Sequence, residues 1–223
     1  MDNISQEDYL TTIYRNLDTA GEIKPNLLAE KLDISNAAVT DMLRKLSRDG
    51  FVDYKKYKSI KLTRTGENYA KNMLRRHRLW EVFLHKKLGM SWDKVHSEAE
   101  MLEHSSSDEM INLLEKFLDF PEVDPHGYPI PDKKGRIKEN TKLIPLTELK
   151  TKDEAVVVRA NDDVRNLLAY LTKIGIELEK KIEVIDMLEY DGSILLKVDG
   201  KDITISRKMA ENIFVEKVTK VLV

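Results

Sequence analysis

The sequence predicts a mainly α-helical protein that ends in a small β domain. Apolar residues recur at helical spacing up to Phe120, a proline-rich run follows, and short β-branched segments separated by Asp-Gly turns fill the rest. With 223 residues, of which 41% are hydrophobic, the chain is long enough for one or two domains of ordinary size or three small ones. We expect three domains, at residues 1-72, 73-141 and 142-223.

The first domain has the pattern of a winged helix-turn-helix. An amphipathic helix opens it, Pro25 suits the first turn of a second helix, and Ser35 caps a third helix that stops at Gly50. Residues 51–54 and 60–63 then alternate as two short strands around a lysine-rich turn. This arrangement is typical of proteins that place a helix in the major groove of DNA.

The second domain should be helical and the third a small β-barrel. Periodicity predicts helices over 67–88, about 91–104 and 108–118, the last opened by a capping pair of Ser106 and Glu109. Residues 121–142 contain four of the six prolines and mark the boundary to the β domain. The barrel is expected to use strands at 154–160, 180–188, 193–198 and 201–205, with a short helix within 161–171.

Charge is unevenly spread, although the net charge is only −2. Met42 to Trp80 carries 12 basic and 3 acidic residues, whereas Glu81 to His126 carries 4 basic and 11 acidic residues. Such neighbouring blocks fit a phosphate-binding module beside a cation-binding module, and two solvated helical faces of opposite sign are the simpler alternative. The residues expected to contact DNA lie at the start of the recognition helix and around the wing: Ser35, Ala37, Ala38, Thr40, Asp41, Lys45, Arg48, Lys55, Lys56 and Lys58.

All five histidines lie in one stretch that is also rich in glutamates. Residues three or four apart share a helix face, so two facing helices could offer imidazoles and carboxylates to a common centre. Because the chain has no cysteine, its nitrogen and oxygen ligands suit manganese, iron(II), cobalt, nickel or zinc. A solvated acidic face with incidental histidines is the alternative, and we interpret His85 and His126 as structural. The candidate ligands are His77, Glu81, His96, Glu100, Glu103 and His104.

The amino-terminal residues are polar and acidic, without the pattern of a signal peptide, and no run of about 18 apolar residues occurs. We therefore expect a cytoplasmic protein with no membrane partner. The absence of cysteine fits a reducing compartment.

The winged helix, the RRHRLWE string at 75–81 and the VHSEAEMLEHSSSDEM string at 95–110 together resemble the diphtheria toxin repressor family of metal-activated transcriptional repressors. The resemblance runs nearly from end to end. It implies a helical metal-binding and dimerisation domain, a C-terminal Src homology 3-like (FeoA-like) barrel, a homodimer, and double-stranded operator DNA as the partner. It implies no organic cofactor.

The resemblance also implies two neighbouring metal sites. Iron-responsive members have methionine and cysteine at two primary-site positions where this chain has Asp8 and Glu100, so it is more similar to the manganese-responsive, manganese transport regulator-like branch. Mn(II) is the expected co-repressor, Fe(II) the alternative, and other divalent transition metals are expected to bind in vitro. The primary site would use Asp8, Glu100, Glu103 and His104, and the ancillary site His77, Glu81 and His96 with Asp163 and Asn166 from the barrel.

One departure concerns Arg78, which matches an arginine that holds an anion in iron-responsive members. Asp124 and Tyr128 stand at the positions of the loop partners of that anion, so we do not claim an anion site here, and whether an anion binds near Arg78 stays open.

These features imply a metal-dependent DNA-binding repressor that controls metal uptake and homeostasis genes, and not an enzyme. Two alternatives from other classes remain. One is a winged-helix regulator that senses an organic effector and keeps its histidines for structure. The other is a metallohydrolase, although the chain has no HExxH string and no separate nucleophile or general base.

Overall fold

The computed structural model describes residues 6–55, 58–164 and 166–218. The chain divides into two compact units: residues 1–77 with 131–137, and residues 78–130 with 138–223. The boundary between them falls inside one long helix, α4 (Arg64–Lys86). Among the helices described, none has the length and apolar character that a bilayer span requires.

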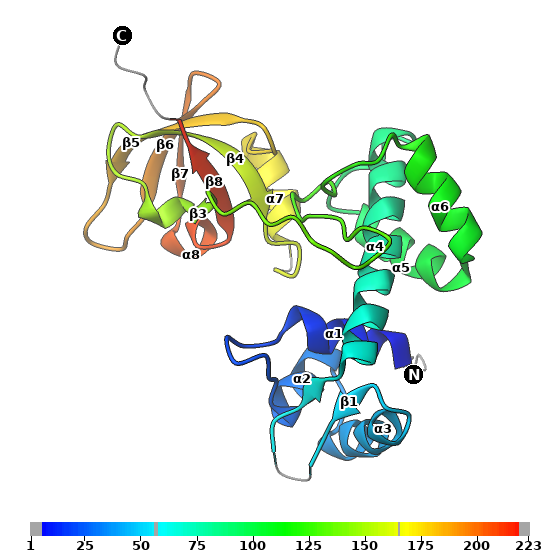
Figure 1. Cartoon of the computed structure of the whole chain (residues 1–223). Coiled ribbons are helices and arrows are strands. Elements are labelled where there is room, and N and C mark those ends of the chain that lie inside the picture. The colour runs from blue at the N-terminus through cyan, green and yellow to red at the C-terminus, as the bar shows by residue number, and fades with distance from the viewer. Residues whose placement is uncertain (1–5, 56–57, 165, 219–223) are drawn as a thin grey trace. The chain divides into compact units, whose positions relative to one another are not determined.

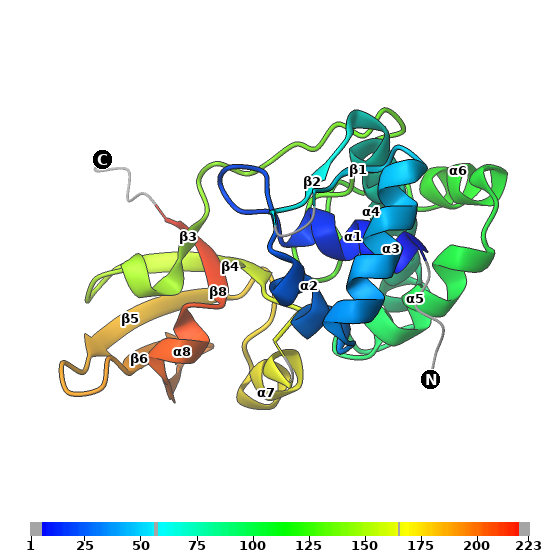
Figure 2. The ribbon, with the colours of Figure 1, turned by 90° about the horizontal axis from the view of Figure 1, so that it is seen from below.

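The first unit is a winged helix-turn-helix, as predicted. It contains α1 (Gln6–Arg15), α2 (Pro25–Leu32), α3 (Asn36–Arg48), β1 (Val52–Asp53), β2 (Lys61–Leu62) and the first part of α4. Figures 1 and 2 both show α1, α2 and α3 gathered around the start of α4. β1 pairs antiparallel with β2, and an isolated bridge joins Ile23 to Ile60. The core is a set of fully buried aliphatic side chains that includes Leu10, Ile13, Leu28, Leu43, Leu46 and Ile60.

The capping residues explain where these helices begin. The Ser35 hydroxyl accepts a hydrogen bond from the Ala38 amide at 3.2 Å and caps α3, as the sequence predicts. α4 begins at Arg64, three residues earlier than predicted, because the Thr63 hydroxyl accepts a hydrogen bond from the Gly66 amide at 3.1 Å.

The helical part of the second unit consists of the rest of α4, α5 (Val95–Ser105) and α6 (Asp108–Phe117). α5 begins at Val95 because the residues before it form a turn, in which the Lys94 amide donates to the Ser91 carbonyl. The predicted Ser106 cap of α6 is wrong by one residue. The Ser107 hydroxyl accepts from the Met110 amide, and the Ser106 hydroxyl instead accepts from the Trp80 indole N–H at 2.8 Å.

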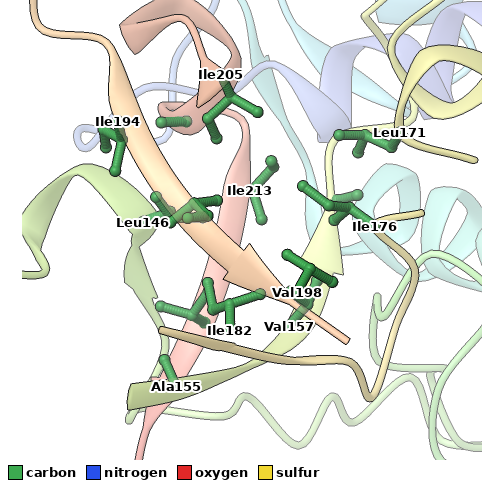
Figure 3. Packing of buried hydrophobic residues seen from close by; sticks show 14 of the residues in the cluster. Leu146, Ala155, Val157, Leu171, Ile176, Ile182, Ile194, Val198, Ile205 and Ile213 are labelled. Atoms are coloured by element: carbon green, nitrogen blue, oxygen red, sulfur yellow. The ribbon is translucent and has the colours of Figure 1, made fainter. Parts of the chain in front are cut away.

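The rest of the second unit is a six-stranded antiparallel sheet in the order β3-β8-β4-β5-β6-β7. Its inward residues, among them Leu146, Ile182 and Ile213, point toward one another and form one core (Figure 3). Bulges on β4 and β5 bend the sheet, and this fold confirms the predicted small β-barrel. Its elements are β3 (Ile144–Pro145), η1 (Leu146–Glu148), β4 (Glu154–Ala160), α7 (Leu167–Ile174), β5 (Lys181–Met187), β6 (Ile194–Val198), β7 (Lys201–Ile205), α8 (Arg207–Ala210) and β8 (Ile213–Lys217).

Candidate metal centre and DNA-reading helix

Glu81 on α4 is the centre of the candidate metal site. Its side chain is fully buried, and it lies one helical turn after His77. Among the described residues, two groups of three ligating side chains have all their candidate atoms within 4.8 Å of one another. One is His77, Glu81 and His96, which the sequence predicted as neighbours, and the other is Glu81, Asp124 and His126.

The distances place two imidazoles beside Glu81 and a barrel carboxylate beside one of these imidazoles. The Nδ1 atom of His96 lies 3.4 Å from Oε1 of Glu81, and the Nδ1 atom of His126 lies 3.7 Å from the same oxygen. His126 Nδ1 is also 3.8 Å from Oδ2 of Asp162, which follows β4. Helix α4, the loop after α6 and the barrel therefore all contribute to one cluster.

His126 is held in the tautomer that a metal ligand needs. Its ring is fully buried, and its Nε2 lies 2.7 Å from the Trp92 carbonyl oxygen. Because a carbonyl can only accept, Nε2 carries the proton. In the described part of the chain Nδ1 has no hydrogen-bond partner, and it faces Glu81 and Asp162. Metal-binding histidines commonly donate their second ring N–H to a backbone carbonyl in this way.

Asp124 shapes the loop that carries His126. Its Oδ1 accepts hydrogen bonds from the backbone amides of His126, at 2.8 Å, and Tyr128, at 3.0 Å, and its Oδ2 lies 3.4 Å from Nε of Arg78. Burial raises the pKa of Asp124 to about 6; the negative charge of Glu81 adds to this rise, and Arg78 opposes it. The ionised cluster is therefore costly in its present environment, and a bound cation would relieve that cost.

Arg78 has partners within the chain. It lies beside Asp124 and donates to the Pro129 carbonyl at 2.5 Å. Two guanidinium groups lie over the Tyr128 ring, with Cζ of Arg78 5.4 Å and Cζ of Arg159 4.9 Å from the ring centroid. The carboxylate of Asp124 thus occupies the position of a counter-ion to Arg78.

The donor set fits a divalent cation with a preference for nitrogen and oxygen. The cluster joins the carboxylates of Glu81, Asp124 and Asp162 to the imidazoles of His96 and His126. The guanidinium of Arg78 lies beside Asp124. Buried carboxylates in this number are stabilised by pairing or by a metal. The absence of sulfur favours hard or borderline metals such as manganese, iron(II) or zinc.

The other predicted ligands lie elsewhere. On α5, Glu100 and His104 are exposed and Glu103 is buried, with Nε2 of His104 3.5 Å from Oε1 of Glu103. Asp8 is half-buried on α1 and belongs to the first unit, whereas α5 belongs to the second.

Asp163, one of the two predicted barrel ligands, is in neither group of three. Asp163 is exposed, and its amide donates to the Asn161 side chain, while Asn166 is exposed at the start of α7 with φ of 62°. The neighbour Asp162 faces His126 instead.

The first turns of α3 present an open polar surface. Of the predicted DNA contacts, Thr40 is half-buried and donates to the Asn36 carbonyl at 2.8 Å, and Asp41 pairs with Arg44 at 3.2 Å. Lys56 lies outside the described residues. The remaining predicted contacts are all exposed: Ser35, Ala37, Ala38, Asp41, Lys45, Arg48, Lys55 and Lys58.

A winged helix with an exposed reading helix, joined to a buried cluster of nitrogen and oxygen donors, defines the class of metal-responsive DNA-binding regulators. Comparison with known families agrees. Residues 4–60 match the iron dependent repressor N-terminal DNA binding domain, residues 63–132 its metal binding and dimerisation domain, and residues 144–217 the FeoA domain. The chain belongs to the iron-dependent repressor family of metal-dependent transcriptional repressors.

Individual relatives cover nearly the whole chain. The iron-dependent repressor IdeR of Mycobacterium leprae is 31% identical over 226 residues, which are 95% of this chain and 96% of the relative. A manganese-dependent transcriptional repressor solved in complex with manganese has a TM-score of 0.85 and 33% identity, covering 96% of this chain and all of that one. ScaR with bound Cd²⁺ has a TM-score of 0.81 and 34% identity, with 96% of this chain covered and 100% of its own. The predicted family and class of function are confirmed.

Proposed function

We propose that this chain is a cytoplasmic, homodimeric repressor that uses Mn(II) as its co-repressor and controls genes of metal uptake and homeostasis. The observation that carries the proposal is the buried cluster of Glu81, Asp124, His126 and Asp162, which offers oxygen and nitrogen and no sulfur. Such ligands suit Mn(II) better than thiophilic metals. Fe(II) is the alternative, because the name of the relative IdeR refers to iron.

The proposed ligands form two sets. The first set is the buried cluster on Glu81, in which His126 and Asp162 join the predicted His77 and His96; we propose Asp162 as the barrel ligand in place of the predicted Asp163 and Asn166. The second set is the predicted primary site, Asp8 with Glu100, Glu103 and His104. A divalent cation would supply the positive charge that holds each set of carboxylates and imidazoles together.

The second set would connect the two units. Asp8 lies on α1 of the winged helix-turn-helix, and its three proposed co-ligands lie on α5 of the other unit. Ligation of all four would restrict the freedom of the DNA-binding unit, which reduces the entropy lost when a dimer docks on two half-sites. A coupling of about 1–3 kcal/mol would change DNA affinity by about 5- to 150-fold.

The helical part of the second unit offers an apolar surface for dimerisation. The resemblance implies a homodimer seam at Trp80, Val82, Phe83 and Leu84; within the protomer Phe83 is half-buried and the other three are buried. Exposed apolar side chains lie nearby, from the end of α4 to the end of α6: Leu88, Met101, Met110, Leu113, Phe117 and Phe120. We propose that these side chains form the apolar surface through which two subunits pair.

The proposal is tested by DNA binding in metal buffers. Fluorescence anisotropy with the DNA upstream of the gene would be measured after chelation and then at defined free Mn(II), Fe(II) and Zn(II). We expect tight binding that requires metal, with Mn(II) active at physiological free concentrations. DNA binding that ignores both chelator and metal would instead favour a regulator with an organic effector.

The wing provides a second test of the DNA interface. Lys55→Ala should weaken binding to operator and to random DNA about equally, and it should reduce the salt slope by about one unit per lost phosphate contact. Lys201→Ala, an exposed lysine of β7, is the matched control and should leave the slope unchanged. An unchanged slope for Lys55→Ala would remove the wing from the proposed interface.

A further inference from the structure

Trp92 lies in the connection between α4 and α5, yet it is buried in the hydrophobic core of the barrel. Only 6% of the residue is exposed, and it belongs to the same apolar cluster as Leu171 and Ile176. Its indole N–H donates to the Thr172 hydroxyl of α7 at 2.6 Å. Trp92 therefore joins the helical part of the second unit to the barrel.

The same residue holds His126 from two sides. The Trp92 carbonyl accepts the Nε2–H of His126, and this contact determines which ring nitrogen faces Glu81. The two rings also stack, with centroids 6.2 Å apart and planes 28° from parallel. Because the indole is fixed in the barrel core, the carbonyl and the ring that position His126 are fixed as well.

The loop that carries His126 lies directly on the barrel. Gly127 has φ of 90°, and a Cβ atom there would be 1.9 Å from the Val158 carbonyl oxygen, so glycine is required for this close approach. The Ala160 amide donates to the His126 carbonyl at 3.0 Å. The metal cluster and the docked barrel thus share the backbone of the same loop.

We infer that Trp92, together with Thr172, is a positioning residue for the buried metal site, and that metal binding and docking of the barrel strengthen each other. The inference rests on the proposed function, in that it takes the Glu81 cluster to be a metal site. By linkage, the factor by which docking raises metal affinity equals the factor by which metal favours docking. Residues that hold the barrel in place then tune the metal response without touching the metal.

The test removes the hydrogen bond between the Trp92 indole and the Thr172 hydroxyl by changing Thr172, the partner that lies farther from the metal cluster. Thr172→Val deletes the acceptor of the indole N–H while keeping the shape of the side chain, and Thr172→Ser keeps the hydroxyl. Thr204→Val, on the exposed face of β7, is the matched control. All variants would be made in the full chain with His104→Ala, which disables the proposed α5 ligands, so that Mn(II) titration reports on the buried cluster.

Loss of this partly buried hydrogen bond should weaken Mn(II) binding by about 3- to 10-fold in Thr172→Val. Thr172→Ser should restore wild-type affinity, and Thr204→Val should not change it. Trp92→Phe, which keeps the carbonyl and an aromatic ring, should match Thr172→Val, and the double variant should be no weaker than either single variant. Mn(II) should also slow hydrogen exchange of the Ala160 amide, and Thr172→Val should reduce that protection.

Two results would overturn the inference. The first leaves the proposed metal site standing, and the second contradicts that site as well. Faster exchange at Ala160 in Thr172→Val, with unchanged Mn(II) affinity, would show that barrel docking and metal binding are independent while leaving the metal site intact. Unchanged Mn(II) affinity in His126→Ala would show that the buried cluster is not the metal site, so the proposed function of that cluster would fail as well.

Discussion

The two sets of proposed ligands differ in how much of the fold surrounds them. The cluster on Glu81 is buried and contains side chains from α4, the His126 loop and the barrel. The Trp92 carbonyl oxygen already orients the His126 ring by accepting a hydrogen bond from Nε2. The set on α5 has two exposed members, Glu100 and His104, and its predicted fourth member, Asp8, belongs to the other unit.

Because of this difference, we expect a metal ion to have a different main effect at each set of ligands. A preformed buried site binds with little loss of conformational freedom, so its main effect is on the stability of the unit that encloses it. A site whose ligands come from two units acts mainly on the freedom of one unit with respect to the other. The following predictions, from the largest expected effect to the smallest, can break or sharpen this distinction.

Glu81→Ala should have the largest effect, because Glu81 belongs to both groups of ligating side chains. We expect it to remove the stabilisation by Mn(II), which at about 100 times the dissociation constant amounts to about 2.7 kcal/mol. Thermal unfolding with and without Mn(II) measures this. Glu98→Ala, at an exposed position of α5, is the control. A metal-induced shift that persists in Glu81→Ala would place the stabilising ion elsewhere.

His104→Ala should separate the two sets. It removes the imidazole of the α5 set, so metal-dependent DNA binding should fall by about 5- to 150-fold. The stabilisation by Mn(II) should remain, because the Glu81 cluster is intact. Anisotropy and thermal unfolding on the same protein give both values. Simultaneous loss of both responses would mean that the two sets work as one unit.

Asp8→Met combined with Glu100→Cys tests metal choice at the α5 set. Sulfur ligands favour iron and later metals over Mn(II), so the ratio of Mn(II) to Fe(II) activation should fall by about 10-fold or more. The ratio must be measured anaerobically in free-metal buffers, with DNA binding intact at saturating metal. An unchanged ratio would move metal selectivity to the Glu81 cluster.

His77→Ala should have the smallest effect. His77 lies one turn from Glu81 on the same helix, while His126 reaches Glu81 from another element and is itself beside Asp162. We expect a loss of metal affinity of about 2- to 5-fold, equivalent to about 0.5–1 kcal/mol. Calorimetric titration of Mn(II) measures it. A loss as large as that in Glu81→Ala would show that the histidine pair on α4 and α5 is the true centre.

Local sequence patterns predicted those features of the fold and the site that depend on residues close together in the sequence. The Ser35 cap and the alternation around the wing predicted the winged helix, and the spacing of His77 and Glu81 predicted a shared helix face. β8 did not stand out, because Ile213–Lys217 is short and follows directly on α8. Yet β8 lies between β3 and β4, so its pairing depends on segments far away in the sequence.

The metal cluster shows the same limit. His126 and Asp162 lie in loops without a periodic pattern, and only tertiary packing brings them to Glu81. We interpreted His126 as structural, whereas the structure places it in a group of candidate ligands. A usable signal was the order Asp124, Pro125, His126, Gly127, in which a carboxylate, an imidazole and a glycine stand close together. The sequence predicts Asp163 as a ligand and the structure places the neighbouring Asp162 beside His126, a difference of one position that no pattern in a loop could decide.

The segment Pro131–Ile137 is grouped with the DNA-binding unit although both of its flanks are grouped with the other unit. There, Gly135 lies against the Lys71 side chain of α4. The order of synthesis therefore matters. As the chain leaves the ribosome from its amino end, the DNA-binding unit is complete only after residue 137, when all of α5 and α6 has already been made. A nascent or truncated fragment that ends before this point keeps the winged-helix core, whose buried residues lie between Tyr9 and Ala70, but lacks the segment that packs against Lys71 of α4.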